Sequence, residues 1–275
     1  MRTRQLLFFL FILISPYYIL AKGKTISKVV IDAGHGGSDI GAQGSFSKEK
    51  DITLAVSLKV GKLLADSIKG MQVIYTRTTD TYPSLIERHQ VANQANADLF
   101  VAIHVNSTPF TYTKVLVGHK MVKRHHKMVK QPIYHSTRHH ETKRSGVETY
   151  VLALHRNSQK ENAIGEMTTE TGLLDLNDPQ TAIILAQYSQ AFQLKSLSLS
   201  SKIQEQFAAE GRPDLGVKQL PLEVLAGSAM PGVLVEIGFI TNVEEETYLN
   251  SEQGQQEVAM AIYKGIKAYK ADAEK

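Results

Sequence analysis

Apolar residues along the chain follow two alternating spacings, which predict a parallel α/β sheet. The runs "VVIDA" (29–33) and "LFVAIHV" (99–105) are apolar nearly throughout, as in strands covered on both faces. Between them, residues 50–69 and 82–96 have the spacing of amphipathic helices, and residues 71–77 have the composition of another strand. Strand, helix, strand, helix, strand is the order of βαβ units. We therefore predict a twisted, mostly parallel sheet of about six strands, flanked by helices.

The same sheet is expected to continue through the second half of the chain. Residues 146–154 form a further strand pattern, and helical patterns follow over residues 156–210. Two more strands are predicted at 217–226 and 232–237, before a closing amphipathic helix. There is no internal repeat and no sign of a second domain. One domain over residues 22–275 accounts for the whole pattern.

One segment, residues 108–145, breaks this rhythm. It has little apolar periodicity and contains six of the ten histidines, so we interpret it as an insertion or long surface loop. Across 119–144, eight Lys or Arg residues face one glutamate, a net charge of 8 − 1 = +7. Three roles stay open: a solvated flexible loop, a surface attracted to anionic wall polymer or lipid headgroups, or a second metal site using the pairs His125/His126 and His139/His140.

The N-terminus has the layout of a secretory signal peptide, which we assign to residues 1–21. Two arginines precede an apolar run from Leu6 to Ile14, and Ala21 offers a small residue for cleavage. The run is shorter than the roughly 20 residues of a membrane span. An uncleaved anchor is the alternative. We expect an exported protein without a transmembrane span in its mature form, with the periplasm as the favoured location and the extracellular space as the other.

Composition narrows the chemistry. The 275 residues are 43% hydrophobic, ample for one sizeable core, and the net charge of +4 is too small to argue for a nucleic-acid partner. The chain contains no cysteine. That excludes a disulfide scaffold, thiol catalysis and thiolate zinc sites, so any metal must be held by His, Asp and Glu.

Four such residues are predicted to lie on one edge of the sheet. His35 follows the first strand, His104 lies at the end of the third, and Glu236 lies at the end of the last. Glu49 stands where the first helix begins. Ligands of open α/β sheets bind beyond the carboxyl ends of the strands, which is where these residues are expected.

The residue types fit a catalytic zinc site. Two imidazoles and one carboxylate form a common three-ligand set that leaves a position for water, and a second carboxylate can serve as general base. Spacing alone does not decide which glutamate is the ligand. Each residue by itself also has a purely structural interpretation, such as a hydrogen-bonded histidine or a solvated glutamate. Together they favour a metal hydrolase.

Long motifs then make the sequence resemble the zinc-dependent N-acetylmuramoyl-L-alanine amidases of type 3, the family of the bacterial cell-separation amidases. The resemblance runs in order from about residue 27 to 269. The matching segments are "VVIDAGHGGSDIGAQG", "KEKDITLAVSLKVGKLL", "TRTTDTYPSLIERHQVAN", "ADLFVAIHVNS", "GVETYVL" and "PGVLVEIGFITN".

The resemblance implies roles for the four residues. His35, Glu49 and His104 would bind Zn²⁺, and Glu236 would be the catalytic base. The implied reaction is hydrolysis of the amide between N-acetylmuramic acid and L-alanine of peptidoglycan, in cell-wall remodelling or cell separation. Asn106 is a candidate for orienting ligand or substrate. Ion pairs beneath the site, in contrast, are expected to hold the structure together, and the residues expected to form them are Arg77, Asp80 and Arg88.

Two alternative functions and one regulatory hypothesis remain. The chain could be a non-catalytic peptidoglycan-binding regulator on the same fold, or a zinc peptidase acting on the stem peptide. In some family members a helix before the closing strands covers the zinc. Here the corresponding segment contains Glu161, Glu166 and Glu170. The hypothesis is that Glu166 or Glu170 blocks the open metal position until a protein activator moves the segment. The alternative is that the segment is a solvated acidic helix.

Overall fold

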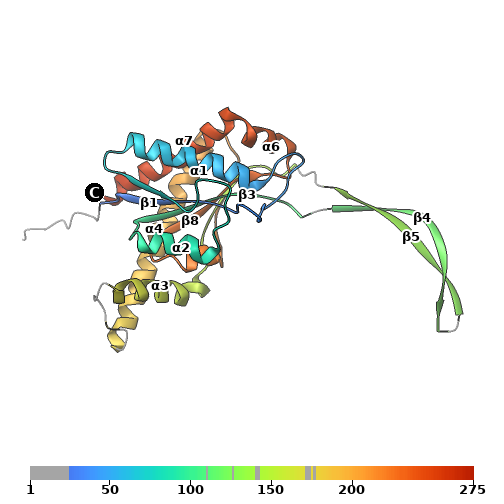
Figure 1. The fold of residues 1–275 in the computed structure, drawn as a ribbon, viewed down its shortest axis with the longest axis horizontal. Coiled ribbons are helices and arrows are strands. Elements are labelled where there is room, and N and C mark those ends of the chain that lie inside the picture. Colours follow the sequence, from blue (N-terminus) through green and yellow to red (C-terminus); the bar gives the residue numbers. More distant parts are fainter. Residues whose placement is uncertain (1–24, 110, 126, 140–142, 171–174, 176–177) are drawn as a thin grey trace, which may run out of the picture.

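A computed structural model describes residues 25–109, 111–125, 127–139, 143–170, 175 and 178–275 (Figure 1). Its centre is a six-stranded sheet in the order β2-β1-β3-β8-β6-β7. This confirms the predicted sheet of about six strands. The strands are β1 (Lys28–Ala33), β2 (Gln72–Tyr75), β3 (Leu99–Asn106), β6 (Val147–Leu152), β7 (Asp214–Leu220) and β8 (Gly232–Phe239).

Strand direction determines which chain segments meet at the predicted site. β2, β1, β3 and β8 run parallel, β6 is antiparallel to β8, and β7 is parallel to β6. The carboxyl ends of β1, β3 and β8 therefore share one edge with the amino ends of β6 and β7. We call this edge the site edge.

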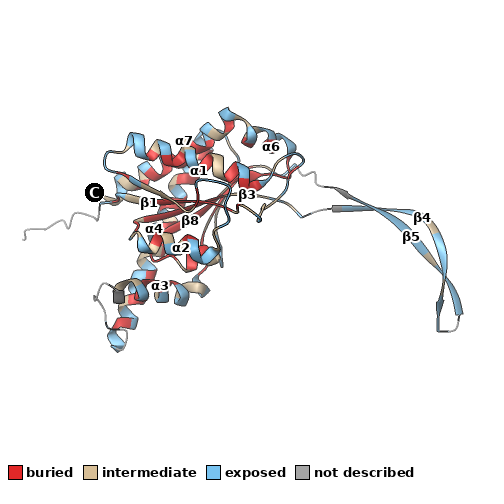
Figure 2. Cartoon of the chain, in the orientation of Figure 1, coloured by how far each residue is buried: buried red, intermediate tan, exposed pale blue. Residues whose placement is uncertain are grey.

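Helices cover both faces of the sheet, and the core lies between the layers. Figure 2 shows the buried positions concentrated on the strands and on the helix faces that pack against them. On one face, α1 (Glu49–Ser67), the C-terminal half of α4 (Pro179–Ala209) and α7 (Glu252–Ala273) form the larger core, with Val56, Ile203 and Ile262 fully buried. The other face carries α2 (Leu85–Gln94) and the short α5 (Glu223–Ala226).

The remaining helices connect these layers. A 3₁₀ turn, η1 (Leu154–Arg156), leads into α3 (Asn157–Glu170), which packs against the N-terminal half of α4 through Ile164 and Leu185. α6 (Val243–Asn250) follows β8 at the site edge. The predicted strand over 217–226 was wrong beyond Leu220, because the chain turns there into α5.

The segment that we interpreted as an insertion or long surface loop contains two long strands that we did not predict. It forms a long antiparallel hairpin of β4 (Thr111–Arg124) and β5 (Lys127–His139), which is separate from the central sheet. Figure 1 shows the hairpin projecting far from the rest of the molecule. Both of its faces are exposed, so no apolar alternation marks it in the sequence. The ladder between its strands pairs the backbone groups that face the neighbouring strand. We call residues 111–139 the ribbon.

No helix among the described residues is long and apolar enough to cross a membrane. The predicted signal peptide, residues 1–21, lies outside the described residues.

Candidate metal centre

His35 stands on a sharp turn directly after β1. Its φ of 59° lies in the left-handed region, which is uncommon for a residue other than glycine. The ring Nδ1 lies 2.8 Å from Oδ2 of Asp39. Because a carboxylate can only accept, Nδ1 must donate, and this fixes the tautomer that leaves Nε2 free of a proton for a metal when the ring is neutral.

Glu49 is the first residue of α1 and is buried. Backbone amides hold the Glu49 carboxylate in place: Val105 donates to Oε1 over 3.0 Å, and Ala42 donates to Oε2 over 2.8 Å. The side chain therefore has a fixed position near the ends of β1 and β3.

His104 lies on β3, and its ring fits against a glycine of the first turn. A Cβ on Gly34 would lie 2.5 Å from Cε1 of His104. Gly41 has a similar role, because a Cβ there would lie 2.6 Å from Oε2 of Glu49 and from Cδ2 of His35. The glycines thus leave the space that the three side chains occupy.

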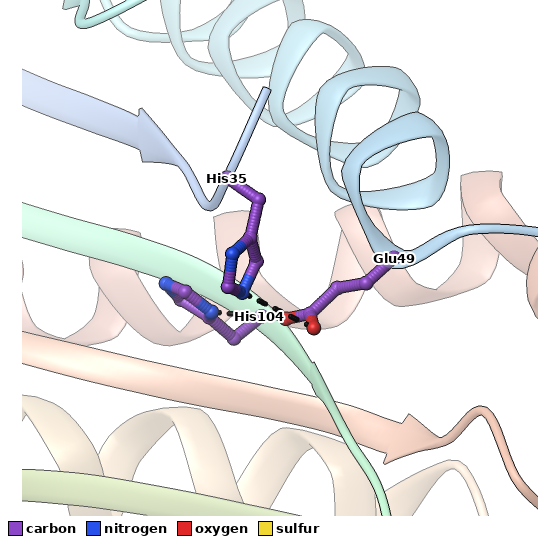
Figure 3. Close-up of side chains that lie close together, drawn as sticks. All are labelled: His35, Glu49 and His104. Atoms are coloured by element: carbon purple, nitrogen blue, oxygen red, sulfur yellow. Dashed lines mark hydrogen bonds and ion pairs between the residues drawn. The ribbon is translucent and has the colours of Figure 1, made fainter. Parts of the chain in front are cut away.

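These three side chains meet at the site edge, as the sequence predicted. Each offers one ligand atom, and the three atoms all lie within 4.8 Å of one another. The Glu49 carboxylate lies beside both rings, with Oε2 3.1 Å from Nε2 of His35 and Oε1 2.9 Å from Nδ1 of His104 (Figure 3). A carboxylate and two imidazoles converging on one point can hold a divalent metal ion.

Charge inside the group favours its ionised forms. Burial lowers the pKa of His35, but Glu49 and Asp39 outweigh burial and raise it to about 9. Burial likewise lowers the pKa of His104, and Glu49 again raises it above the ordinary value. For Glu49, burial raises the pKa, but hydrogen bonds from the two histidines bring it well below its usual range. The carboxylate is thus negative and draws positive charge to the site.

Glu236 lies beside this group on the next strand. Its Cα is the register partner of the His104 Cα across β3 and β8, and of the Glu148 Cα across β8 and β6. Burial raises the pKa of Glu236 to about 7, and the nearby negative charges of Glu49 and Glu148 add to this. Its Oε2 is buried and has no hydrogen-bond partner within the described part of the chain. This carboxyl group is therefore placed next to the histidines without being bonded to them.

Asn106 is held by a residue that the sequence analysis did not single out. Its Nδ2 donates to Oε2 of Glu148 over 3.2 Å. Glu148 is almost fully buried, and it also accepts from Tyr150 and pairs with Arg144 and Lys218. The signal was the "GVETYVL" segment, which places a glutamate inside an otherwise buried strand. Asn106 is thus fixed at the site edge by a charged network.

The residues expected beneath the site are structural. Arg88 forms a buried ion pair with Asp32 over 2.7 Å and donates to the carbonyl of His35. Asp80 pairs with Lys50 over 2.6 Å. Arg77 differs from the expected ion pairs in bonding mainly to carbonyl groups, including that of Gly34. These contacts brace the His35 turn from below.

Glu246 on α6 is a second residue that the sequence analysis missed. Its carboxylate accepts from the backbone amides of Ser45, Phe46 and Ser47, at 2.8 to 2.9 Å, and from the Ser47 hydroxyl. These residues lie directly before Glu49. A buried carboxylate on α6 therefore fixes the turn that delivers the Glu49 side chain.

The residues expected to block the site lie on α3. Glu166 is exposed, and its charge acts on His89 of α2. It is not a member of the His35, Glu49 and His104 group. The Glu170 side chain lies outside the described residues. The helix itself is held by the buried Lys160, whose Nζ donates to Leu225 O, Ser228 Oγ and Met230 O.

Comparison with known proteins decides the family. The family model described as N-acetylmuramoyl-L-alanine amidase matches residues 29–268. This chain belongs to that family. The amidase is 33% identical to the uncharacterized protein YqiI of Bacillus subtilis (strain 168), over 90% of this chain and 85% of that protein. It is 30% identical to N-acetylmuramoyl-L-alanine amidase AmiA of Escherichia coli (strain K12), over 88% of this chain and 75% of AmiA.

Solved structures agree with this assignment. The amidase superposes on the N-acetylmuramoyl-L-alanine amidase of Clostridium difficile 630 with a TM-score of 0.60 and 26% sequence identity, covering 89% of this chain and 97% of that one. The amidase is thus an enzyme that hydrolyses peptidoglycan, and it carries a His-Glu-His group that fits a metal site.

Proposed function

We propose that the amidase cuts the amide between N-acetylmuramic acid and L-alanine with a Zn²⁺ ion held by His35, Glu49 and His104, and with Glu236 as general base. The observation that carries the proposal is the convergence of three ligand atoms within 4.8 Å at the site edge. Two nitrogen donors and one carboxylate favour zinc, because magnesium and calcium prefer oxygen ligands alone.

The surroundings of the three donors support a resident cation. Without a cation, the negative charge of Glu49 is balanced by protonation of His35 and His104, whose pKa values it raises. A divalent ion would take the place of those protons. The buried, unpartnered Oε2 of Glu236 is a second sign, because a polar atom left without a partner is costly unless a ligand or water binds there.

The remaining chemistry is assigned to the chain's own groups. When bound, zinc supplies Lewis-acid chemistry at the scissile carbonyl. Glu236 takes a proton from the attacking water while the C–O bond forms, and then passes that proton to the leaving amine of L-alanine as the C–N bond breaks. The products are a lactyl carboxylate and a free stem peptide. Burial raises the pKa of Glu236, which makes it a stronger base than an exposed glutamate.

Asn106 is proposed to orient the substrate. Its amide is tied to Glu148 at the site edge, so its remaining hydrogen-bonding groups have a restricted direction. We further propose that the leader at residues 1–21 exports the amidase, with the periplasm as its place of action, where its substrate lies.

The test is hydrolysis of purified sacculi, with and without a chelator, with the products identified by mass. The proposal expects stem peptides with a free N-terminal alanine, glycan strands without peptides, and loss of both on chelation. Cleavage within the stem peptide would identify a zinc peptidase instead. Binding without any product, in protein reconstituted with zinc, would identify a non-catalytic regulator.

A further inference from the structure

Figure 2 shows that the ribbon is exposed along most of its length. Its exposed residues include apolar ones on both of its faces. Met121 and Met128 are 56% and 58% exposed, and Val129 is 39% exposed. A two-stranded hairpin is marginally stable in water by itself. Its exposed apolar side chains contribute no stabilising free energy until a partner removes them from water. The exposed apolar residues of the ribbon are Tyr112, Val115, Leu116, Val117, Met121, Met128, Val129, Ile133 and Tyr134.

Strand register places cations and apolar side chains together at the far end of the ribbon, residues 120–130, which we call the distal end. Val122 pairs with Val129, so both point to one face. Two positions on, at the same face, Arg124 pairs with Lys127. The pairs that point to the opposite face are Met121 with Lys130 and Lys123 with Met128. Each face of the distal end therefore combines apolar side chains with cations.

The charge of the ribbon has no counter-charge within it. Residues 112–137 contain six Lys or Arg and no Asp or Glu. Arg124 and Lys127 are direct cross-strand partners, an arrangement of like charges that destabilises a hairpin. No acidic side chain among the described residues forms an ion pair with either of them. An anionic partner outside the chain would remove this repulsion.

We propose that the distal end binds an anionic phospholipid surface, with its Met and Val side chains in the interface and its Lys and Arg side chains at the headgroup phosphates. Basic residues near an anionic leaflet each contribute to binding, and apolar side chains add to it by leaving water. The ribbon has two open edges, so it lies at the interface and does not span the bilayer.

Two other occupants fit the surface less well. A second copy of the ribbon would bring the same cations together without any acidic residue to pair with them. An anionic wall polymer would satisfy the charges but would leave the exposed Met and Val side chains in water. A lipid surface accounts for the charge and the apolar exposure together.

Lipid binding at the distal end would also orient the active site. The ribbon begins five residues after Asn106, the last residue of β3, so it starts from the site edge. The 14 residues of β4 extend roughly 45 Å at about 3.3 Å per residue. The site edge would then face the membrane from that distance and act on the wall layer nearest to it.

The experiment measures binding to lipid vesicles by the chain from residue 22 to 275, so that the expected leader cannot bind lipid itself. The vesicles are pure phosphatidylcholine, or phosphatidylcholine with one quarter phosphatidylglycerol. We expect binding only to the anionic vesicles. The triple variant Lys123→Gln, Arg124→Gln, Lys127→Gln should bind roughly a hundredfold more weakly. The matched control, Lys69→Gln, Lys195→Gln, Lys267→Gln, removes the same charge from exposed positions on the body and should bind far more tightly than the ribbon variant.

A fluorescent probe tests insertion of the apolar side chains. Because the chain has no tryptophan, a single introduced one reports on its own surroundings. Met128→Trp should shift its emission to shorter wavelength on anionic vesicles, whereas Leu194→Trp, at a 62% exposed position on α4, should not. Circular dichroism of each variant checks the fold of the body.

Two results would overturn the proposal. One is equal vesicle binding by the wild type and the ribbon triple variant, together with an unshifted emission of the Met128→Trp variant. The other is absence of vesicle binding together with binding to lipid-free sacculi that requires Lys123, Arg124 and Lys127, which would assign the ribbon to wall polymer. Neither result depends on zinc or on hydrolysis, so the outcome is separate from the proposed catalytic function.

Discussion

His104 and Glu236 are register partners on the neighbouring parallel strands β3 and β8. Residues paired in this way point to the same face of the sheet, so the ladder of backbone bonds sets the position of the proposed base relative to the metal group. A slip of one residue in this register would turn Glu236 to the opposite face. The distance between ligand and base is therefore a property of the sheet, not of a flexible loop.

Asp39 should increase metal affinity through His35. It accepts from Nδ1 over 2.8 Å and holds the ring with Nε2 toward Glu49. We expect Asp39→Asn to weaken zinc binding about 10- to 100-fold, because the amide is a weaker and uncharged acceptor. Competition with a chromogenic chelator measures this. Asp66→Asn, at an exposed Asp paired with Lys62, is the control; an Asp39→Asn affinity equal to that of the control would refute the positioning role.

Glu246 should stabilise the fold in a pH-dependent manner. Burial raises its pKa, but hydrogen bonds from residues 45–47 outweigh burial and hold the pKa below the ordinary value of a glutamate. A group with a lowered folded-state pKa stabilises above its unfolded value and loses that contribution as the pH falls through the folded value. We expect Glu246→Gln to reduce the free energy of unfolding by about 2 kcal/mol at pH 7, and by less at pH 3.

Urea unfolding at the two pH values tests this prediction. Glu244→Gln, at an exposed position on the same helix, is the matched control and should change stability little at either pH. A Glu246→Gln deficit that is the same at pH 3 and pH 7 would show that the carboxylate charge is not what stabilises the turn.

Blocking of the site by α3 stays a prediction. In this structure α3 is held by buried Lys160, and Glu166 is not part of the His35, Glu49 and His104 group, so a resting state with Glu166 at the metal would need α3 to move. If either glutamate blocks the site, its replacement by alanine should raise hydrolysis of sacculi several-fold without any partner protein, with Glu161→Ala as the comparison. Unchanged rates of hydrolysis in all three variants, with zinc retained, would show that these glutamates do not block the site.

The sequence predicted those parts of the fold and site that depend on strand order. Apolar spacing located the strands. His35, His104 and Glu236 stand at the carboxyl ends of three of them, so parallel strands place these residues at one edge of the sheet. The roles of Glu148 and Glu246 could not be predicted, because the fold brings their partners from 42 and 200 residues away. Asp39 lies only four residues after His35, and its role depends on the sharp turn between them. The ribbon was missed because both of its faces are exposed.

The most direct test of the account is the zinc content of three purified variants beside the wild type, measured by elemental mass spectrometry together with turnover. The account expects stoichiometric zinc in the wild type and near-complete loss of both zinc and turnover in His35→Ala and His104→Ala. Glu236→Gln should keep its zinc while its turnover falls about a thousandfold, because the base does not hold the metal. Stoichiometric zinc in either histidine variant, or full turnover in Glu236→Gln, would contradict the account.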